Sequence, residues 1–290
     1  MERNFRADPW DRVWAKEGID VCQSSLTQVM ARDSYYRLYR FLIQKAGVFR
    51  GPAKRRALEA GCGSGLRALA LTQEEKKRIQ SCVLLDFSPE ALRLSKEMAG
   101  KNGLLRNNGG GALSFARADL FGMPFPENTF DIIWNEGVME HFDGAGRQRG
   151  FDLIYRILRP GGFFICIVPN RLNLPFMLYK RLRVRRGRWE YGFQREFTVQ
   201  ELKSRFVKAG FEVTAVGGID CCRPIKGLLK ELGEENRPTP QNDPVPPANP
   251  SGEKFGLHFR RTKEKFWKWE MKFGFGQWLG ADIGVCGKKG

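Results

Sequence analysis

The segment best suited to hold a ligand is a glycine-rich turn, EAGCGSG at residues 59–65. It follows a short apolar run and precedes a helical pattern that starts at Leu66. Glycines in such a turn let the backbone bend tightly and approach a ligand more closely than any Cβ atom allows. They are spaced G-x-G-x-G, and Leu66 stands where the dinucleotide fingerprint G-x-G-x-x-G has its third glycine. The turn alone predicts an adenosine-type ligand and leaves a nicotinamide or flavin dinucleotide open.

Two acidic residues narrow the choice of ligand. Asp86 ends the next apolar run, in VLLDFSPEAL, where a carboxylate can accept hydrogen bonds from both hydroxyls of a ribose. Asp119 ends the third run, in ARADLFG, where a side-chain oxygen can accept a hydrogen bond from the exocyclic amine of adenine. For Asp119 the roles of helix N-cap and surface acid stay open. The two acids and the glycine turn together predict a site for adenosine that carries a short zwitterionic tail.

The elements that must position these residues follow from the hydrophobic pattern. Short apolar runs alternate with polar, helix-like stretches from Arg56 to Val168, which is typical of a mainly parallel sheet covered on both faces. Residues 23–49 carry apolar side chains at three- and four-residue steps, the pattern of an amphipathic helix. We expect RPGG at residues 159–162 to end a helix and turn the chain into the next strand. Further on, the sequence predicts a helix capped by Thr198 and a strand at 211–219.

Four segments together resemble the class I S-adenosylmethionine-dependent methyltransferases, in particular the group that methylates small molecules and isoprenoid quinones. They are ALEAGCGSG, VLLDFSPEAL, ADLFGMPFPENTFDIIWNEGVMEHF and LIYRILRPGGFFICIVPN, between residues 57 and 170. The resemblance implies methyl transfer from S-adenosylmethionine, with S-adenosylhomocysteine as product, to a small apolar or anionic acceptor. It also implies an α/β fold: a doubly wound, seven-stranded, mainly parallel sheet of the Rossmann-like type, with its last strand antiparallel at Ala281–Gly287.

The resemblance implies which residues of this sequence bind the cofactor, because they occupy the positions of the family's binding residues. It places Glu59 near the methionine ammonium, Asp86 at the ribose, and Asn135 beside the methionine moiety. The full set of implied cofactor-binding residues is Glu59, Gly61, Cys62, Gly63, Gly65, Asp86, Phe87, Asp119, Leu120, Asn135 and Glu136. Cys62 is interpreted as a small residue that fills the loop, not as a nucleophile.

A catalytic base is needed only if the acceptor loses a proton. The candidates follow the fourth strand and are His141, Glu136 and Glu140; His141 is the first of them, although a structural role at a helix start stays open. Only two histidines and no C-x-x-C pair occur in the chain, so the sequence predicts no metal site.

The composition shifts along the chain indicate a modular organisation. The expected parts are a helical N-terminal cap at 1–50, a cofactor-binding core at 51–220 with a basic insertion at 171–197, an insertion at 221–275 with a proline-rich loop (237–250) and a basic aromatic helix, and the final strand within 276–290.

The net charge of +17 suggests an anionic partner. Much of it comes from residues 174–188 and 259–273, which could contact an anionic membrane surface or RNA; a solvated basic face and helix packing are the simpler alternatives. The longest apolar run, 163–168, is too short to span a bilayer, and the first residues lack the apolar region of a signal peptide. We therefore expect a cytoplasmic protein and leave peripheral attachment to a membrane open.

Two other functions compete with small-molecule methylation. An RNA methyltransferase is favoured by the charge, but the Asn/Asp-Pro-Pro-aromatic motif of enzymes that methylate nucleobase amines is absent, because residues 135–138 read NEGV. A non-catalytic module that binds S-adenosylmethionine is disfavoured by the intact set of cofactor motifs.

Overall fold

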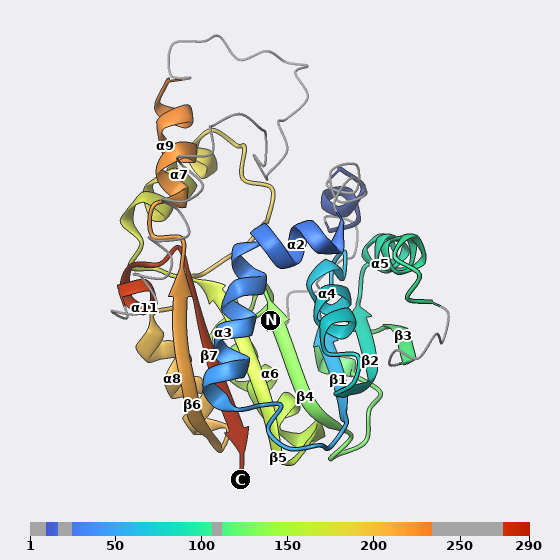
Figure 1. Ribbon diagram of the computed structural model, residues 1–290. Coiled ribbons are helices and arrows are strands. Elements are labelled where there is room, and N and C mark those ends of the chain that lie inside the picture. The colour runs from blue at the N-terminus through green and yellow to red at the C-terminus, as the bar shows by residue number, and fades with distance from the viewer. Residues whose placement is uncertain (1–9, 17–24, 106–111, 234–274) are drawn as a thin grey trace.

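One seven-stranded sheet forms the centre of the protein (Figure 1). The computed structural model describes residues 10–16, 25–105, 112–233 and 275–290. The strand order is β3-β2-β1-β4-β5-β7-β6, and every pairing is parallel except those of β7. The strands are β1 Arg55–Ala60, β2 Ile79–Asp86, β3 Ala112–Arg117, β4 Phe130–Glu136, β5 Leu158–Pro169, β6 Phe211–Ile219 and β7 Asp282–Lys289. This confirms the predicted fold class and its antiparallel last strand.

Helices cover both faces of the sheet. They are α2 Leu26–Arg32, α3 Ser34–Ala46, α4 Leu66–Glu74, α5 Pro89–Lys101, α6 Gly144–Ile157, α7 Leu174–Arg185, α8 Val199–Lys208, α9 Arg223–Gly233 and α11 Phe275–Leu279, with the short 3₁₀ turns η1 Leu120–Gly122 and η2 Met139–His141. Apolar residues of α2, α3, α4 and α5 share one buried cluster with the sheet, and those of α6 and α8 share a second. The core therefore has two layers, one on each side of the strands.

Local capping sets where several helices begin. Ser88 Oγ accepts a hydrogen bond from the Ala91 amide (3.1 Å), and Pro89 occupies the first turn of α5. Thr198 Oγ1 accepts one from the Glu201 amide (3.1 Å) at the start of α8. Such bonds satisfy amides that a helix start leaves unpaired. The predicted start of α8 and the predicted strand β6 are both confirmed.

Two local expectations need correction. The amphipathic pattern at 23–49 is divided into α2 and α3, because Asp33 adopts an extended conformation and its carboxylate accepts the Tyr36 amide (2.7 Å) to start the second helix. The segment at 159–162 does not separate a helix from a strand. Helix α6 already ends at Ile157, and 159–162 form an irregular part of β5, where the pairing with β4 jumps from Leu158 to Phe163.

The topology fixes where a ligand can bind. From β1 the chain continues outward to β2 and β3 in one direction, whereas from β4 it continues to β5 in the opposite direction. The strand order therefore reverses between the neighbouring strands β1 and β4. In open parallel sheets this reversal opens a binding site at the carboxyl ends of the strands. The glycine turn follows β1, Asp86 ends β2, and Asn135 and Glu136 end β4. The predicted residues are thus brought to one edge of the sheet.

Some expectations fall on residues beyond the described ranges. These include the proline-rich loop at 237–250 and the basic aromatic stretch at 259–273. No helix among the described residues is both long and apolar enough to cross a membrane.

Candidate functional site

The glycine turn is packed tightly and needs its glycines. Gly61, Gly63 and Gly65 have φ angles of 78°, 51° and 67°, a region that favours glycine. A Cβ atom on Gly65 would lie 2.4 Å from Leu84 Cδ2, and one on Gly61 would lie 2.5 Å from Val138 Cγ2. Gly65 is therefore required by the packing between the turn and β2, whatever ligand binds.

Asp86 links the end of β2 to the glycine turn. Its Oδ2 accepts the Gly63 amide (2.8 Å) and its Oδ1 accepts the Ser88 amide (2.9 Å). Burial raises the pKa of Asp86, and the backbone amides of Ser88 and Gly63 oppose that shift. An ionised carboxylate offers about four acceptor positions. The two backbone bonds therefore leave Asp86 able to accept ligand hydroxyls.

Partly buried charged side chains form a network near the turn. Glu136 Oε1 lies 3.1 Å from Arg67 Nη1, and Arg67 Nη2 lies 3.2 Å from Asp33 Oδ2. Glu59 is buried beside this network, and burial together with the charge of Glu136 raises its pKa to about 8. Arg67 and Asp33 were not predicted as site residues, although Arg67 lies only two residues after the glycine turn. The network carries more acidic than basic groups, which suits a cationic ligand.

Several buried polar atoms at this edge lack a partner. Within the described part of the chain, Glu59 Oε2, Tyr39 Oη and both Asn135 side-chain polar atoms make no hydrogen bond. Leaving such atoms unpaired costs about 1–3 kcal/mol each. Glu59 and Asn135 were predicted to meet the ligand, whereas Tyr39 of α3 was not. These atoms fit the ammonium and carboxylate of an amino-acid tail.

The buried Glu59 has a measurable consequence for stability. We expect Glu59→Gln to gain stability relative to the unmodified protein as pH rises from about 5 to 8, by at most about 1.4 kcal/mol per pH unit. Folded Glu59 keeps its proton up to about pH 8, whereas the unfolded group has its ordinary pKa of 4.5, so the folded state binds the extra proton in this window. Glutamine stays neutral in both states, so the variant does not lose this part of the free energy of unfolding as pH rises. Urea unfolding across this pH range measures the difference; Glu212→Gln, an exposed carboxylate, is the control, and a difference that does not vary with pH would contradict the assignment.

His141 and Glu140 are buried on η2, after β4. His141 Nδ1 lies 2.8 Å from the Phe193 carbonyl oxygen; because a carbonyl only accepts, Nδ1 carries the proton and Nε2 is an acceptor. Burial lowers the pKa of His141 to about 4 and raises the pKa of Glu140 to about 8. Both candidates therefore carry no charge near neutral pH. Glu136, the third candidate, is held in its ion pair with Arg67.

The remaining predicted residues have local structural roles as well. Asp119 is exposed, and its Oδ1 accepts the Phe121 amide (2.7 Å), so it caps η1. Leu120 is buried. The Phe87 carbonyl accepts a bond from Arg117 Nε (3.2 Å). Cys62 is buried, and burial raises its pKa well above the ordinary value, which fits a loop-filling thiol better than a nucleophile.

A short N-terminal helix, residues 10–16, lies over the site. The Trp10 ring meets the edge of His141 with centroids 4.9 Å apart, and Ser88 Oγ is hydrogen-bonded to Asp11. A Cβ atom on Gly63 would lie 2.3 Å from the Trp14 ring. This contact could not be predicted from the sequence, because the pattern of one short helix does not indicate its distant partners. The helix packs against the glycine turn, α5 and η2.

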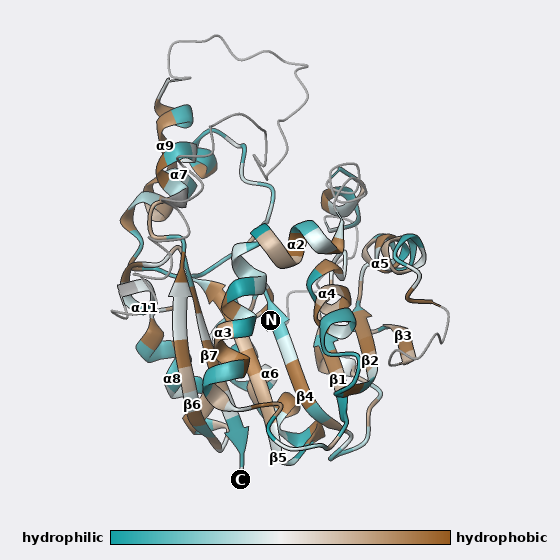
Figure 2. Ribbon diagram, viewed as in Figure 1, coloured by the Kyte–Doolittle hydropathy of each residue, from teal (hydrophilic) through white to brown (hydrophobic). Residues whose placement is uncertain are grey.

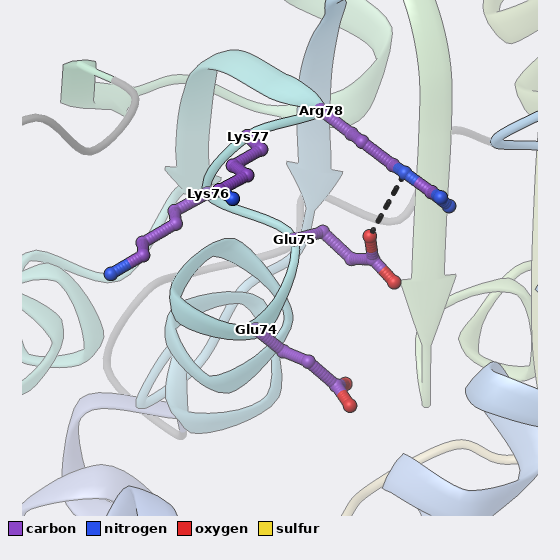
Figure 3. A pocket seen from close by; sticks show the side chains of 5 residues that line it. All are labelled: Glu74, Glu75, Lys76, Lys77 and Arg78. Atoms are coloured by element: carbon purple, nitrogen blue, oxygen red, sulfur yellow. Dashed lines mark ion pairs between the residues drawn. The ribbon is translucent and has the colours of Figure 1, made fainter. Parts of the chain in front are cut away.

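A surface hollow elsewhere does not belong to the site. It is lined by residues 74–78, where Arg78 Nε lies 3.8 Å from Glu75 Oε2 (Figure 3). These residues join the end of α4 to the start of β2 and so lie at the opposite end of that strand from Asp86. The described residues also contain no group of three His, Cys, Asp or Glu side chains placed to hold a metal ion.

Comparison with known proteins identifies the fold that carries this site. Residues 58–166 match the family model described as "Methyltransferase domain". Over this range the chain is similar to methyltransferase domains. The matched range begins inside β1 and ends inside β5, so it contains the glycine turn, Asp86, Asp119, Asn135 and His141.

Named relatives of this methyltransferase domain act on small molecules. The ubiquinone/menaquinone biosynthesis C-methyltransferase of Brucella abortus is 30% identical over 132 residues, 43% of this chain and 45% of that protein. The sterol 24-C-methyltransferase of Pneumocystis carinii is 26% identical over 195 residues, 65% of this chain and 46% of that protein. The chain thus matches about half the length of these relatives. A crystal structure of geranyl diphosphate methyltransferase in complex with GPP and sinefungin has the same fold, with a TM-score of 0.53 and 14% identity over 88% of this chain and 77% of that one.

Proposed function

We propose that this protein transfers a methyl group from S-adenosylmethionine to a small apolar or anionic molecule. The observation that carries the proposal is the carboxyl edge of β1, β2 and β4. There a tight glycine turn, a carboxylate bonded to it, and buried polar atoms without partners in the described residues come together. When bound, S-adenosylmethionine supplies a methyl group on a cationic sulfonium, so the protein needs no metal for the chemistry.

The side chains divide the work of holding this ligand. Asp86 would accept the ribose hydroxyls, while Asp119 and Leu120 would flank the adenine. Glu59 and Asn135 would pair with the methionine moiety, because their free polar atoms are buried beside the turn. Alignment of donor and acceptor, together with the exclusion of water, is the main contribution that such a site makes to the rate.

The acceptor is inferred from the relatives. Their names describe C-methyltransferases of quinone biosynthesis and of sterols, and both acceptor classes are apolar. The charge of the chain had also suggested RNA, but the comparisons offer no support for an RNA methyltransferase or for a non-catalytic module. C- or O-methylation of a small molecule is therefore preferred.

We expect Asp86→Ala to weaken binding of S-adenosylhomocysteine about 5- to 150-fold, since the loss of ribose hydrogen bonds to a charged group costs about 1–3 kcal/mol. Isothermal titration calorimetry measures the change. Asp152→Ala, an exposed acid on α6, is the control, and Asp86→Asn tests the charge with little change of shape.

Two outcomes would contradict the proposal at different levels. Unaltered affinity of a folded Asp86→Ala variant would remove Asp86 from the ribose site. Absence of binding by the unmodified protein, to either S-adenosylmethionine or S-adenosylhomocysteine, would overturn the function itself.

A further inference from the structure

Helices α7 and α9 form a pair that extends from one end of the sheet (Figure 1). Helix α7 follows the carboxyl end of β5, and α9 follows that of β6; these two strands run in the same direction because both are antiparallel to β7. The helices touch closely, since a Cβ atom on Gly227 would lie 3.1 Å from the Tyr179 ring. The pair is therefore placed beside the edge that holds the candidate site.

Charged groups fill the inner side of this pair. The side chain of Glu231 in α9 is only 5% exposed. It forms ion pairs with Arg183 (2.9 Å), Arg186 (3.0 Å) and Arg188 (3.7 Å). Lys180 is paired with the buried Glu196. Part of the basic run that the sequence predicted as a solvated face is thus turned inward and neutralised.

The exposed residues of the two helices, together called the outer side, include several apolar side chains. Leu174 and Leu229 are 76% and 63% exposed. The other exposed apolar residues of the two helices are Leu178, Val184, Ile225 and Leu232. On α9 the exposed positions 225, 229 and 232 follow the three- and four-residue spacing of a single stripe. The helix carries both hydrophobic and hydrophilic residues (Figure 2). A helix pair in water normally buries its leucines, whereas these apolar residues are exposed and part of the charge is paired between the helices.

The outer side also carries positive charge. Arg181, Arg185 and Lys230 are exposed near the leucines. Helix α7 has no acidic residue, and the one acid within α9, Glu231, is buried in the ion pairs described above. Leucines bordered by cations are the composition of a helix that lies in the interface of an anionic membrane. A second copy of the same face would instead place like charges opposite each other.

We propose that the outer face of α7 and α9 docks onto an anionic lipid surface. The leucines enter the boundary between headgroups and acyl chains, and the three cations contact lipid phosphates. The docking itself does not depend on the methyl-transfer proposal, so each can fail without the other.

Vesicle flotation of the full chain tests this inference. We expect binding to phosphatidylcholine vesicles that contain phosphatidylglycerol, little binding to phosphatidylcholine alone, and weaker binding at high salt. The double variant Leu174→Ser/Leu229→Ser should lower the partition coefficient roughly tenfold or more, because two exposed leucines no longer enter the lipid. Arg181→Gln/Lys230→Gln should lower it about fivefold for each cation removed.

A matched control is Leu105→Ser, since Leu105 is also exposed but lies outside this helix pair. It should bind vesicles as the unmodified protein does. All variants should keep the affinity for S-adenosylhomocysteine, which separates docking from the site. The proposal is overturned if the unmodified chain does not float with anionic vesicles, if Leu174→Ser/Leu229→Ser floats as well as Leu105→Ser, or if sedimentation equilibrium shows a dimer that this double variant abolishes.

Discussion

Replacement of Arg147 by methionine is expected to lower the free energy of unfolding by about 3–5 kcal/mol, the usual cost of breaking a buried ion pair by removing one partner. The Arg147 side chain is 1% exposed, and its Nη1 lies 2.9 Å from Glu201 Oε1. Its Nε donates to the Phe142 carbonyl (3.1 Å), and its Nη2 donates to the Arg195 carbonyl. Methionine fills a similar volume but satisfies none of these acceptors.

Arg147 also stacks on an aromatic ring, with its Cζ 3.8 Å from the centroid of Phe197. Its bonds connect helix α6 to residues 195–197, and the Arg195 amide donates to the Glu140 carbonyl (2.9 Å). Loss of Arg147 should therefore loosen the segment that packs against η2. Urea unfolding measures the stability, and Arg149→Met, an exposed arginine on the same helix, is the matched control, expected to change it by less than about 0.5 kcal/mol. If Arg147→Met proves as stable as Arg149→Met, the buried network contributes no net stability.

The central part of the fold could be predicted from the sequence because its strands, turns and helix starts depend on residues close together in the chain. Strand β5 contains the continuous apolar run at 163–168, and Ser88 and Thr198 are caps next to the helices they start. The glycine turn was recognisable from its spacing, and its position after β1 follows from the alternation of strands and helices. Asp86 and Asn135 came to the same edge because parallel strands end together.

The parts that could not be predicted depend on partners far apart in the chain. Arg67 pairs with Glu136, and Trp14 contacts Gly63. In both pairs the residues around one partner give no indication of the other partner. The periodicity of a sequence indicates which face of a helix is apolar. A prediction based on it assumes that this face is buried. Helix α9 departs from that assumption, because Glu231 is buried in ion pairs with α7 while Leu229 and Leu232 are exposed. The break at Asp33 is similar: the apolar spacing continues across it, and one cap decides the outcome.

Substitution of His141 separates a catalytic base from a residue that only positions the site. If Nε2 removes a proton from the acceptor, we expect His141→Ala to lower kcat about 10²- to 10⁴-fold with little change in affinity for S-adenosylhomocysteine. Asparagine is the informative comparison, because its side-chain amide can still donate to the Phe193 carbonyl, as Nδ1 does now, but cannot act as a base.

His141→Asn should therefore keep the melting temperature of the unmodified protein and lose as much kcat as His141→Ala. The pH profile gives an independent test: burial lowers the pKa of His141 to about 4, so its neutral, proton-accepting form persists throughout the neutral range. The kcat of the unmodified protein should accordingly fall on the acid side only as pH approaches about 4. A His141→Asn variant that retains the full rate would show that the imidazole does not act as a base and contributes only through its bond to the Phe193 carbonyl oxygen.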